Sequence, residues 1–393
     1  MIHKDVLESH NNKRRITMKK TKVFSILMLV VFVSLTLVFI PGCNKSEKLE
    51  DVKKFNIGVM LPLTGNIGFI GENFRNGMLL AKKENKSSIE VNFIFEDHKN
   101  SPKDAISIYR KFMNYNQMPI IVPTLTSIIN SIIPLTKEDD KLLIGSIISQ
   151  TDIPDKSEWL FRYFLSTNDE VNMMVRYFSS KNINNVGVFY VNDDYGIDAT
   201  NQFQKMFKGN IVFNEAFEKT AIDFKNLVPK ARDAESVYIL GYGSNYGIFV
   251  KQLRMMGYKG KIFAFSSFST PIVIKTVEEY GEGVIFTGTV FSDLKNNIGL
   301  SSFIERYKAY FNSVPDHYSA YGFDIGTIII KVLDQANGEK IEISRINLKK
   351  IILSWINFKG LFGDTKINPN KDFLFEHVFL YSITKSGEIY KVE

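Results

Sequence analysis

The chain has 393 residues, of which 45% are hydrophobic and 23% charged. This composition is typical of a globular protein with room for two domains, and it excludes a disordered chain or a multispan membrane protein. The formal net charge of +7 is concentrated at the start, and from Cys43 onward 42 basic side chains stand against 40 acidic ones. We therefore expect no nucleic-acid partner.

Cys43 is the only cysteine. The chain therefore cannot form an internal disulfide, and zinc sites built from four cysteines, or from two cysteines and two histidines, are excluded. Three histidines follow the first 42 residues, namely His98, His317 and His377, and they lie far apart in the sequence. We expect each to be structural or exposed, and we expect no metal site and no cofactor.

The N-terminal segment has the pattern of a secretory signal peptide. A basic stretch begins at Met18, an apolar run covers residues 23–40, and Pro41-Gly42-Cys43 follows. The sequence Ile40-Pro41-Gly42-Cys43 resembles a bacterial lipobox, which implies that Cys43 is acylated and becomes the new N-terminus. An uncleaved membrane anchor is the alternative, because the apolar run is just long enough to span a bilayer. Both alternatives place the rest of the chain outside the cytoplasmic membrane.

The first half of the remaining chain alternates apolar strands with amphipathic helices. Residues 1–17 precede a second Met and are left out of the fold prediction, and residues 44–54 are predicted to be a polar tether. Residues 66–71 are predicted to be a glycine-containing loop. The pattern predicts strands at 55–61, 89–95, 119–123 and 142–148, with helices at 72–83 and 102–115 and a helical stretch after Ser127.

The pattern begins again after a possible crossover at residues 161–164. Its clearest part is the apolar run 186–191, which lacks alternation and so predicts a strand buried on both faces of a parallel sheet. A polar turn at 192–196 contains Tyr195, which lies where open α/β sheets bind their ligands. The other predicted strands are 211–213, 236–240 and 261–265, and the predicted helices are 169–179, 197–208, 224–231, 245–256, 303–311 and 322–335.

Two consecutive series of strand–helix units predict an α/β protein with two doubly wound parallel-sheet lobes. A cleft between such lobes is a natural site for a small molecule.

Several short motifs give the chain a resemblance to a known family. They lie at residues 57–65, 76–77, 96–97, 191–196, 223–224, 241–242, 253–257, 358–363 and 368–370. In this order and spacing they resemble the leucine/isoleucine/valine-binding protein family, the type I periplasmic binding proteins of ABC transporters. The resemblance implies three crossovers between the lobes, with a first lobe of residues 55–166 plus 290–370 and a second of 167–289 plus 371–393.

The resemblance also implies a set of ligand-binding residues. Hydroxyls at strand ends in the first lobe would hold a carboxylate, although hydroxyls before helices are also ordinary N-caps. Aromatic residues of the second lobe would close over the ligand, and Phe69 would contact it from the first loop. The implied ligand-binding residues are Phe69, Thr126, Ser127, Ile147, Ser149, Tyr195, Tyr242 and Ser266.

One of these positions departs from the family pattern. Where family members commonly carry an acid that pairs with the ligand's ammonium group, this chain has Ser266. A hydrogen bond to a charged group contributes roughly 1.5–3 kcal/mol, so we expect weaker ammonium binding, and a carboxylate without the amine or an amide becomes equally compatible. Asp193 or Asp194 could substitute, although capping the turn is their expected role.

The resemblance implies a lipid-anchored solute-binding protein that captures a small polar ligand, such as a branched-chain or other amino acid, by hinge closure. Its expected partners are that ligand, the membrane subunits of an ABC importer and the membrane itself. A sensory module of the same fold without transport is the alternative. We do not expect an enzyme, because the sequence contains neither a G-x-S-x-G elbow nor a P-loop, and Gly241-Tyr242-Gly243 lacks the spacing of a dinucleotide-binding loop.

Overall fold

The computed structural model describes residues 53–392, except 116–117, 293–297 and 376–377. The predictions for the signal peptide, the acylated Cys43 and His377 therefore fall outside the described residues. Val52–Glu393 form one compact unit. In the described part of that unit, no helix combines the length and apolar character needed to cross a bilayer.

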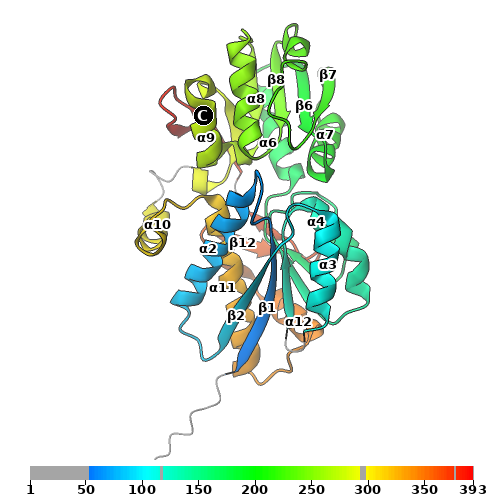
Figure 1. Ribbon diagram of the computed structural model, residues 1–393, viewed down its shortest axis with the longest axis vertical. Coiled ribbons are helices and arrows are strands. Elements are labelled where there is room, and N and C mark those ends of the chain that lie inside the picture. Colours follow the sequence, from blue (N-terminus) through cyan, green and yellow to red (C-terminus); the bar gives the residue numbers. More distant parts are fainter. Residues whose placement is uncertain (1–52, 116–117, 293–297, 376–377, 393) are drawn as a thin grey trace, which may run out of the picture. The chain divides into compact units, whose positions relative to one another are not determined.

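The first lobe is built on a five-stranded parallel sheet (Figure 1). Its strands run in the order β2-β1-β3-β4-β5, and their bounds are Lys54–Leu61 for β1, Glu90–Asp97 for β2, Ile120–Pro123 for β3, Leu142–Gly145 for β4 and Leu160–Arg162 for β5. The sheet carries helices α2 (Gly68–Glu84), α3 (Pro102–Met113), α4 (Thr126–Ile132), α11 (His317–Gly338) and α12 (Arg345–Ser354).

Alternate residues of these strands enter two separate cores. Ile57 and Val59 belong with Ile120 to the core under α2 and α11, whereas Met60 and Ile121 belong to the core under α3 and α4. Because successive side chains of a strand point to opposite faces, both faces of the sheet are covered. This burial explains why the strands read as continuous apolar runs in the sequence.

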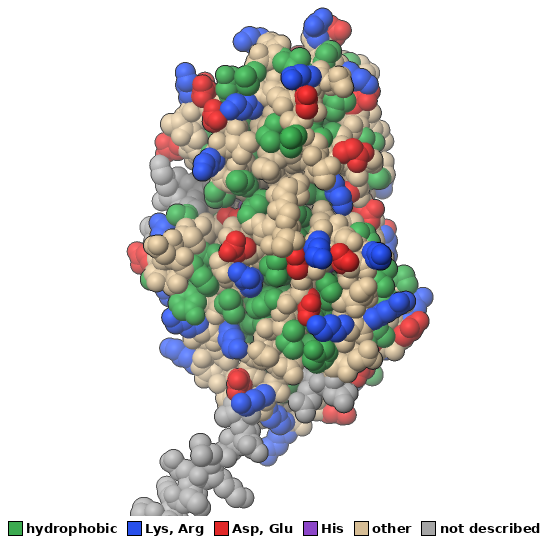
Figure 2. Space-filling model, in the orientation of Figure 1, with side chains coloured by type: hydrophobic (Ala, Val, Ile, Leu, Met, Phe, Trp, Pro, Cys, Tyr) green, Lys and Arg blue, Asp and Glu red, His purple; other side chains and the backbone are tan. Residues whose placement is uncertain are grey.

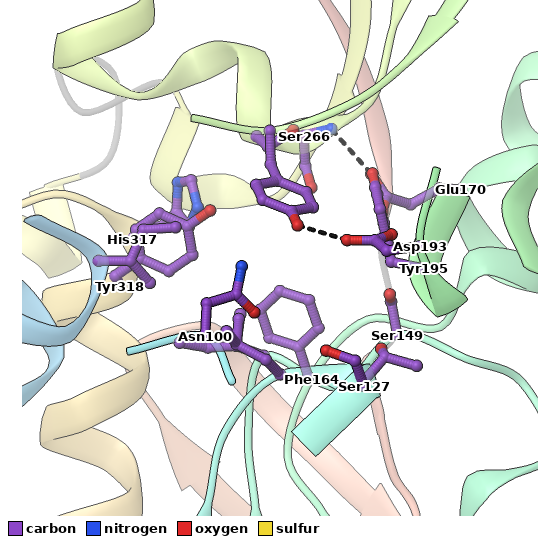
Figure 3. A pocket seen from close by; sticks show the side chains of 16 residues that line it. Asn100, Ser127, Ser149, Phe164, Glu170, Asp193, Tyr195, Ser266, His317 and Tyr318 are labelled. Atoms are coloured by element: carbon purple, nitrogen blue, oxygen red, sulfur yellow. Dashed lines mark hydrogen bonds between the residues drawn. The ribbon is translucent and has the colours of Figure 1, made fainter. Parts of the chain in front are cut away.

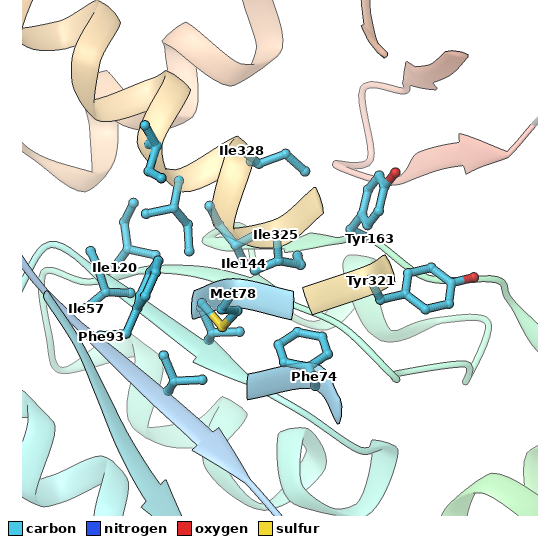
Figure 4. Close-up of a cluster of buried hydrophobic side chains, with 14 of the residues drawn as sticks. Ile57, Phe74, Met78, Phe93, Ile120, Ile144, Tyr163, Tyr321, Ile325 and Ile328 are labelled. Atoms are coloured by element: carbon cyan, nitrogen blue, oxygen red, sulfur yellow. The ribbon is translucent and has the colours of Figure 1, made fainter. Parts of the chain in front are cut away.

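Helices α2 and α11 approach closely enough to require glycine at the contact. A Cβ atom on Gly77 would lie 2.0 Å from the carbonyl oxygen of Ser319, and one on Gly322 would lie 2.0 Å from that of Phe74. Figure 4 shows Phe74 and Met78 of α2 packed with residues of α11 and of the sheet. Through this contact, α11 brings its first residues to the same end of the lobe as the start of α2.

The second lobe contains a seven-stranded sheet in the order β15-β14-β10-β9-β8-β6-β7. Five strands are parallel, and the C-terminal β14 and β15 are antiparallel additions. The strand bounds are Asn185–Val191 for β6, Asn210–Phe217 for β7, Ser236–Leu240 for β8, Lys261–Ala264 for β9, Ile285–Gly288 for β10, Phe379–Ile383 for β14 and Ile389–Lys391 for β15. Its helices include α6 (Thr167–Ser180), α7 (Asp194–Met206), α8 (Ser244–Met255) and α9 (Pro271–Val277).

The chain passes between the lobes three times, after β5, after β10 and before β14. Helix α10 (Ile298–Phe311) follows the second crossing, and the short helix α5 (Ile153–Lys156) lies before β5. A small antiparallel sheet of β11 (Asn357–Gly360), β12 (Gly363–Ile367) and β13 (Phe373–Phe375) precedes the third crossing. The predicted fold class of two doubly wound parallel-sheet lobes joined by three crossovers is confirmed.

The last predicted lobe boundary needs a correction. The sequence prediction placed residues 371–393 in the second lobe, but β13 pairs with β12, and Phe373 packs against Phe161 and Tyr163 of the first lobe. Arg162 reinforces this placement with two bonds of 2.6 Å to the Asp372 carboxylate. The chain therefore leaves the first lobe only after Phe375.

The helix predicted at 224–231 is wrong. Only residues 228–231 form a turn of 3₁₀ helix, because Pro229 has no N–H to donate and its ring disfavours a continuous α-helix through this segment. The N–H of Phe224 is instead bonded to the side chain of Gln252 at 2.7 Å. The predicted loop at 66–71 is also partly helical, since α2 begins at Gly68.

A buried carboxylate on α11 holds the β11–β12 turn against the first lobe. Asp324 accepts hydrogen bonds from the Tyr163 hydroxyl at 2.7 Å and from the Leu361 N–H at 2.8 Å. Gly360 permits this approach, because a Cβ there would lie 2.5 Å from the Asp324 carboxylate. Burial raises the pKa of Asp324 to about 7, although both bonds oppose the rise.

This raised pKa predicts a pH-dependent effect of Asp324→Asn. The folded protein binds a proton at Asp324 that the unfolded chain has released, so stability from this group is present at low pH and is lost as pH rises from about 4 to about 7. In urea unfolding, the free energy of the variant minus that of the parent should therefore increase between pH 5 and pH 8. A difference that stays constant with pH would contradict the assignment.

Candidate functional site

A pocket lies between the two lobes, at the carboxyl ends of the parallel strands (Figure 3). Its cavity volume is about 50 Å³. The lining residues of the first lobe are Ile70, Asn100, Leu125, Thr126, Ser127, Ile147, Ser149, Phe164, His317 and Tyr318. Those of the second lobe are Glu170, Asp193, Tyr195, Tyr242, Ser266 and Ser267.

Two strained residues lie beside the pocket where strands of the first lobe end. Leu125 follows β3 with a φ of 76°, and Ile147 follows β4 with a φ of 58°. A positive φ is uncommon for any residue with a Cβ and is a genuine outlier for a β-branched one. Such strain persists where the surroundings hold it in place, here through the bond from Thr124 Oγ1 to Met60 O and that from Ser146 Oγ to Tyr163 O.

Three hydroxyls next to these residues face the pocket, namely those of Thr126, Ser127 and Ser149. Within residues 53–392 as the structure describes them, Ser149 is hydrogen-bonded through its backbone carbonyl, and none of the three hydroxyls forms a hydrogen bond to the protein. The hydroxyls just behind them at Thr124 and Ser146 are bonded to backbone carbonyls. The inner hydroxyls thus hold the strand ends, and the outer hydroxyls are available to a ligand.

The loop after β2 brings Asn100 into the lining. Lys99 and Asn100 both have left-handed backbones, with φ of 53° and 54°. His98 supports this loop: its Nδ1 accepts from the Asn100 N–H at 3.1 Å, and its Nε2 lies 3.3 Å from Thr124 Oγ1. Burial lowers the pKa of His98 to about 4, so this histidine is a neutral structural residue, as the sequence predicted.

The second lobe contributes a pair of tyrosines to the lining. The rings of Tyr195 and Tyr242 meet edge to face, with centroids 5.6 Å apart. The Tyr242 hydroxyl donates to Asp193, whose other oxygen accepts from the Gly196 N–H at 3.1 Å and caps α7. Burial raises the pKa of Asp193, and these two bonds oppose the rise. The predicted capping role of Asp193 is confirmed.

Glu170 is the second carboxylate of the lining, and α6 places it there. Its side chain is only 2% exposed. The Oε1 atom accepts from the Ser266 N–H at 2.8 Å and from Thr287 Oγ1 at 2.6 Å. Burial raises the pKa of Glu170, and hydrogen bonding from Thr287 and from the backbone and side chain of Ser266 partly offsets that effect.

The lobes also touch each other around the pocket. Lys219 follows β7, and its Nζ donates to the Asn100 carbonyl at 3.2 Å while its own carbonyl accepts from Asn66 Nδ2 at 3.1 Å. On another side, Asn130 of α4 donates to Asp194 Oδ2 of α7 at 2.8 Å. These contacts join residues of the first lobe to residues of the second.

The structure brings seven of the eight predicted ligand-binding residues to this pocket, all except Phe69. Phe69 packs edge to face on Tyr318 at 6.3 Å, and Tyr318 lines the pocket instead. Sequence reasoning missed Asn100, Phe164, Glu170, His317 and Tyr318. Glu170 had a detectable signal, because it lies four residues before Met174 and eight before Phe178, on the buried stripe of its helix.

Comparison with known proteins gives the chain relatives of one kind. A family model described as periplasmic binding protein matches residues 54–388. The branched-chain amino acid transporter substrate-binding protein of Streptococcus pneumoniae, solved with isoleucine, is 19% identical with a TM-score of 0.78, covering 87% of this chain and 99% of that one.

Two further solved structures extend the comparison. A leucine-binding protein of Thermotoga maritima is 21% identical with a TM-score of 0.77, covering 86% of this chain and 98% of that one. An ABC transporter solute-binding protein of Rhodopseudomonas palustris, solved with benzoate, is 17% identical with a TM-score of 0.78, covering 86% of this chain and 95% of that one. At these identities the likeness establishes the fold.

Two serines three residues apart allow a direct test of the available hydroxyls. Ser149→Ala should leave the melting temperature of the ligand-free protein nearly unchanged, because its hydroxyl has no partner to lose among the described residues. Ser146→Ala should destabilise the protein by about 1 kcal/mol, because it removes a buried bond to the Tyr163 carbonyl. Equal melting losses in the two variants, measured by calorimetry, would contradict this division of roles.

Proposed function

The chain belongs to the periplasmic binding protein family, and from that membership we propose that it is a solute-binding protein of an ABC importer. It captures a small polar ligand between its lobes outside the cytoplasmic membrane and delivers it to the importer's membrane subunits. The ligand is an amino acid or an amino-acid-like carboxylate or amide. The N-terminal segment anchors the protein to the membrane through a lipid on Cys43.

The observation that carries this proposal is the pocket lined by both lobes. Three hydroxyls that have no hydrogen-bond partner among the described residues, those of Thr126, Ser127 and Ser149, lie on its first-lobe side. Tyr195 and Tyr242 lie on its second-lobe side. A ligand that touches both sides stabilises the arrangement in which the lobes are together, which is the basis of hinge closure in such proteins.

The surface charge of the described chain agrees with a small-molecule ligand. Figure 2 shows basic and acidic side chains interspersed over the visible face. This mixture agrees with the near balance of charge from Cys43 onward and offers no extended basic area on that face for nucleic acid. A sensory module with the same pocket is the second candidate, and a gene neighbourhood with or without importer subunits distinguishes the two.

The direct test is a thermal-shift screen of the purified protein against amino acids, their keto and amide analogues, short peptides and small carboxylates. A ligand at about 100 times its dissociation constant should add roughly 2.7 kcal/mol of stability, which the screen detects. Stabilisation of the protein by compounds of one chemical class supports the proposal. Turnover of the bound compound, or no stabilisation by any of them, would contradict it.

The contacts between the lobes predict a loss of affinity in Lys219→Met. The variant keeps the aliphatic stem but loses the bond from Nζ to the Asn100 carbonyl. A bond contributing about 1 kcal/mol to the closed form should lower ligand affinity about fivefold, because less of the protein is then in the binding-competent state. Titration calorimetry of the best ligand from the screen measures this change.

Lys225→Met is the matched control, because Lys225 pairs with Asp223 inside the second lobe, at 3.6 Å, and both side chains are exposed. It should leave the affinity unchanged. Equal affinities for Lys219→Met and Lys225→Met would show that the contact at Lys219 does not contribute to closure.

A further inference from the structure

The lining of the pocket has an unbalanced charge. It contains two carboxylates, Glu170 and Asp193, and among its described residues neither lysine nor arginine. The one histidine of the lining, His317, does not supply a positive charge near neutral pH, because burial lowers its pKa to about 3. A ligand entering this pocket therefore meets negative charge on the side of the second lobe.

The two carboxylates differ in how they are already used. Asp193 caps α7 through the Gly196 N–H, and its second oxygen accepts from the Tyr242 hydroxyl. Both oxygens of Asp193 are thus engaged, and its place at the N-terminus of a helix favours a negative charge without any ligand. Its position is explained by the protein alone.

The contacts of Glu170 within the protein do not explain in the same way why a carboxylate is buried at its position. Both of its hydrogen bonds, from the Ser266 N–H and from Thr287 Oγ1, go to the single oxygen Oε1. No cationic group of the described residues forms an ion pair with it. A buried carboxylate without a cation is costly, and a positively charged ligand group would remove that cost.

The hydrogen bond from the Ser266 backbone places Glu170 beside the position that departs from the family pattern. The backbone N–H of Ser266 lies 2.8 Å from Glu170 Oε1, so a carboxylate stands beside the position at which the sequence lacks an acid. The acid comes from α6 instead of from the turn after β9. The absence of an acid at residue 266 therefore leaves the pocket with an anionic group in the same neighbourhood.

Resting on the proposed function, we infer that Glu170 pairs with an ammonium group of the ligand and selects amino acids over carboxylates that lack the amine. The ammonium group faces Glu170 in the second lobe, and the carboxylate faces the unpartnered hydroxyls of Thr126, Ser127 and Ser149 in the first lobe. A zwitterion satisfies both sides at once, and a simple anion places its charge in a pocket that already holds two carboxylates.

The cavity has room for more than one water molecule. A single water needs roughly 10–15 Å³ of such volume, and the cavity volume is about 50 Å³. The aromatic rings of Phe164 and Tyr318 form part of its wall (Figure 3). Alanine, which carries both charged groups on few atoms, is therefore a suitable probe for this pocket.

The test compares three small compounds by titration calorimetry on the purified full-length protein. Alanine carries both charged groups, propionate lacks the ammonium group, and ethylamine lacks the carboxylate. The parent protein should bind alanine at least tenfold more tightly than either of the other two. In Glu170→Gln, alanine binding should weaken roughly 10- to 100-fold, which is the range for one hydrogen bond to a charged group.

Propionate binding distinguishes charge recognition from structural damage. In Glu170→Gln the new amide oxygen can still accept from the Ser266 N–H, so the melting temperature of the ligand-free variant should not fall. Its affinity for propionate should stay the same or rise, because a negative charge has been removed. An equal loss of alanine and propionate binding, or a lower melting temperature, would mean that Glu170 only supports the fold and would overturn the inference.

Asp193→Asn is the competing variant. It should weaken the binding of alanine and the binding of propionate to a similar extent, because Asp193 acts by holding Tyr242 and α7. A loss of the preference for alanine in Asp193→Asn but not in Glu170→Gln would assign the ammonium partner to Asp193 and overturn the inference.

The outcome for the parent protein separates this inference from the proposed function. Equal binding of propionate and alanine overturns the role of Glu170 and leaves the binding-protein function standing. If ethylamine is the one compound that binds tightly, the inferred contact between the ligand carboxylate and the first-lobe hydroxyls is overturned. If the protein binds neither these three compounds nor any compound of the wider screen, both proposals are overturned.

Discussion

The site depends on one constraint of parallel sheets, namely that the carboxyl ends of all strands lie at the same edge. In both lobes that edge borders the same pocket, so the residues just after β2, β3, β4, β6 and β8 all reach it. The connections must turn sharply there, and left-handed backbones at Leu125 and Ile147 make the turns. The hydroxyls and tyrosines of the pocket thus follow from strand position.

The same constraint explains what the sequence predicts well. Strands such as β1 and β6 are buried on both faces, so they read as apolar runs, and the polar residues that follow them mark the pocket edge. Thr126, Ser149 and Tyr195 can be found in this way. The helix predicted at 224–231 failed because its apolar spacing was given more weight than Pro229.

The residues that were missed come from helices, or from loops shaped by distant contacts. His317 and Tyr318 begin α11, which glycine contacts with α2 bring to the pocket from far along the chain. The apolar stripe of its helix marks Glu170 as buried, but only its hydrogen bonds to Ser266 and Thr287 reveal that it lies at the pocket. Local pattern carries no information about such pairings, because they depend on how whole elements pack.

The proposed function requires that one small ligand binds between the lobes and contacts both of them. A crystal structure of the protein with the tightest-binding compound tests it most directly. We expect one molecule in the pocket, bonded to Ser149 or its neighbouring hydroxyls on one side and to Glu170 on the other. A ligand bound outside this pocket, or in contact with only one lobe, would contradict binding by closure of the two lobes.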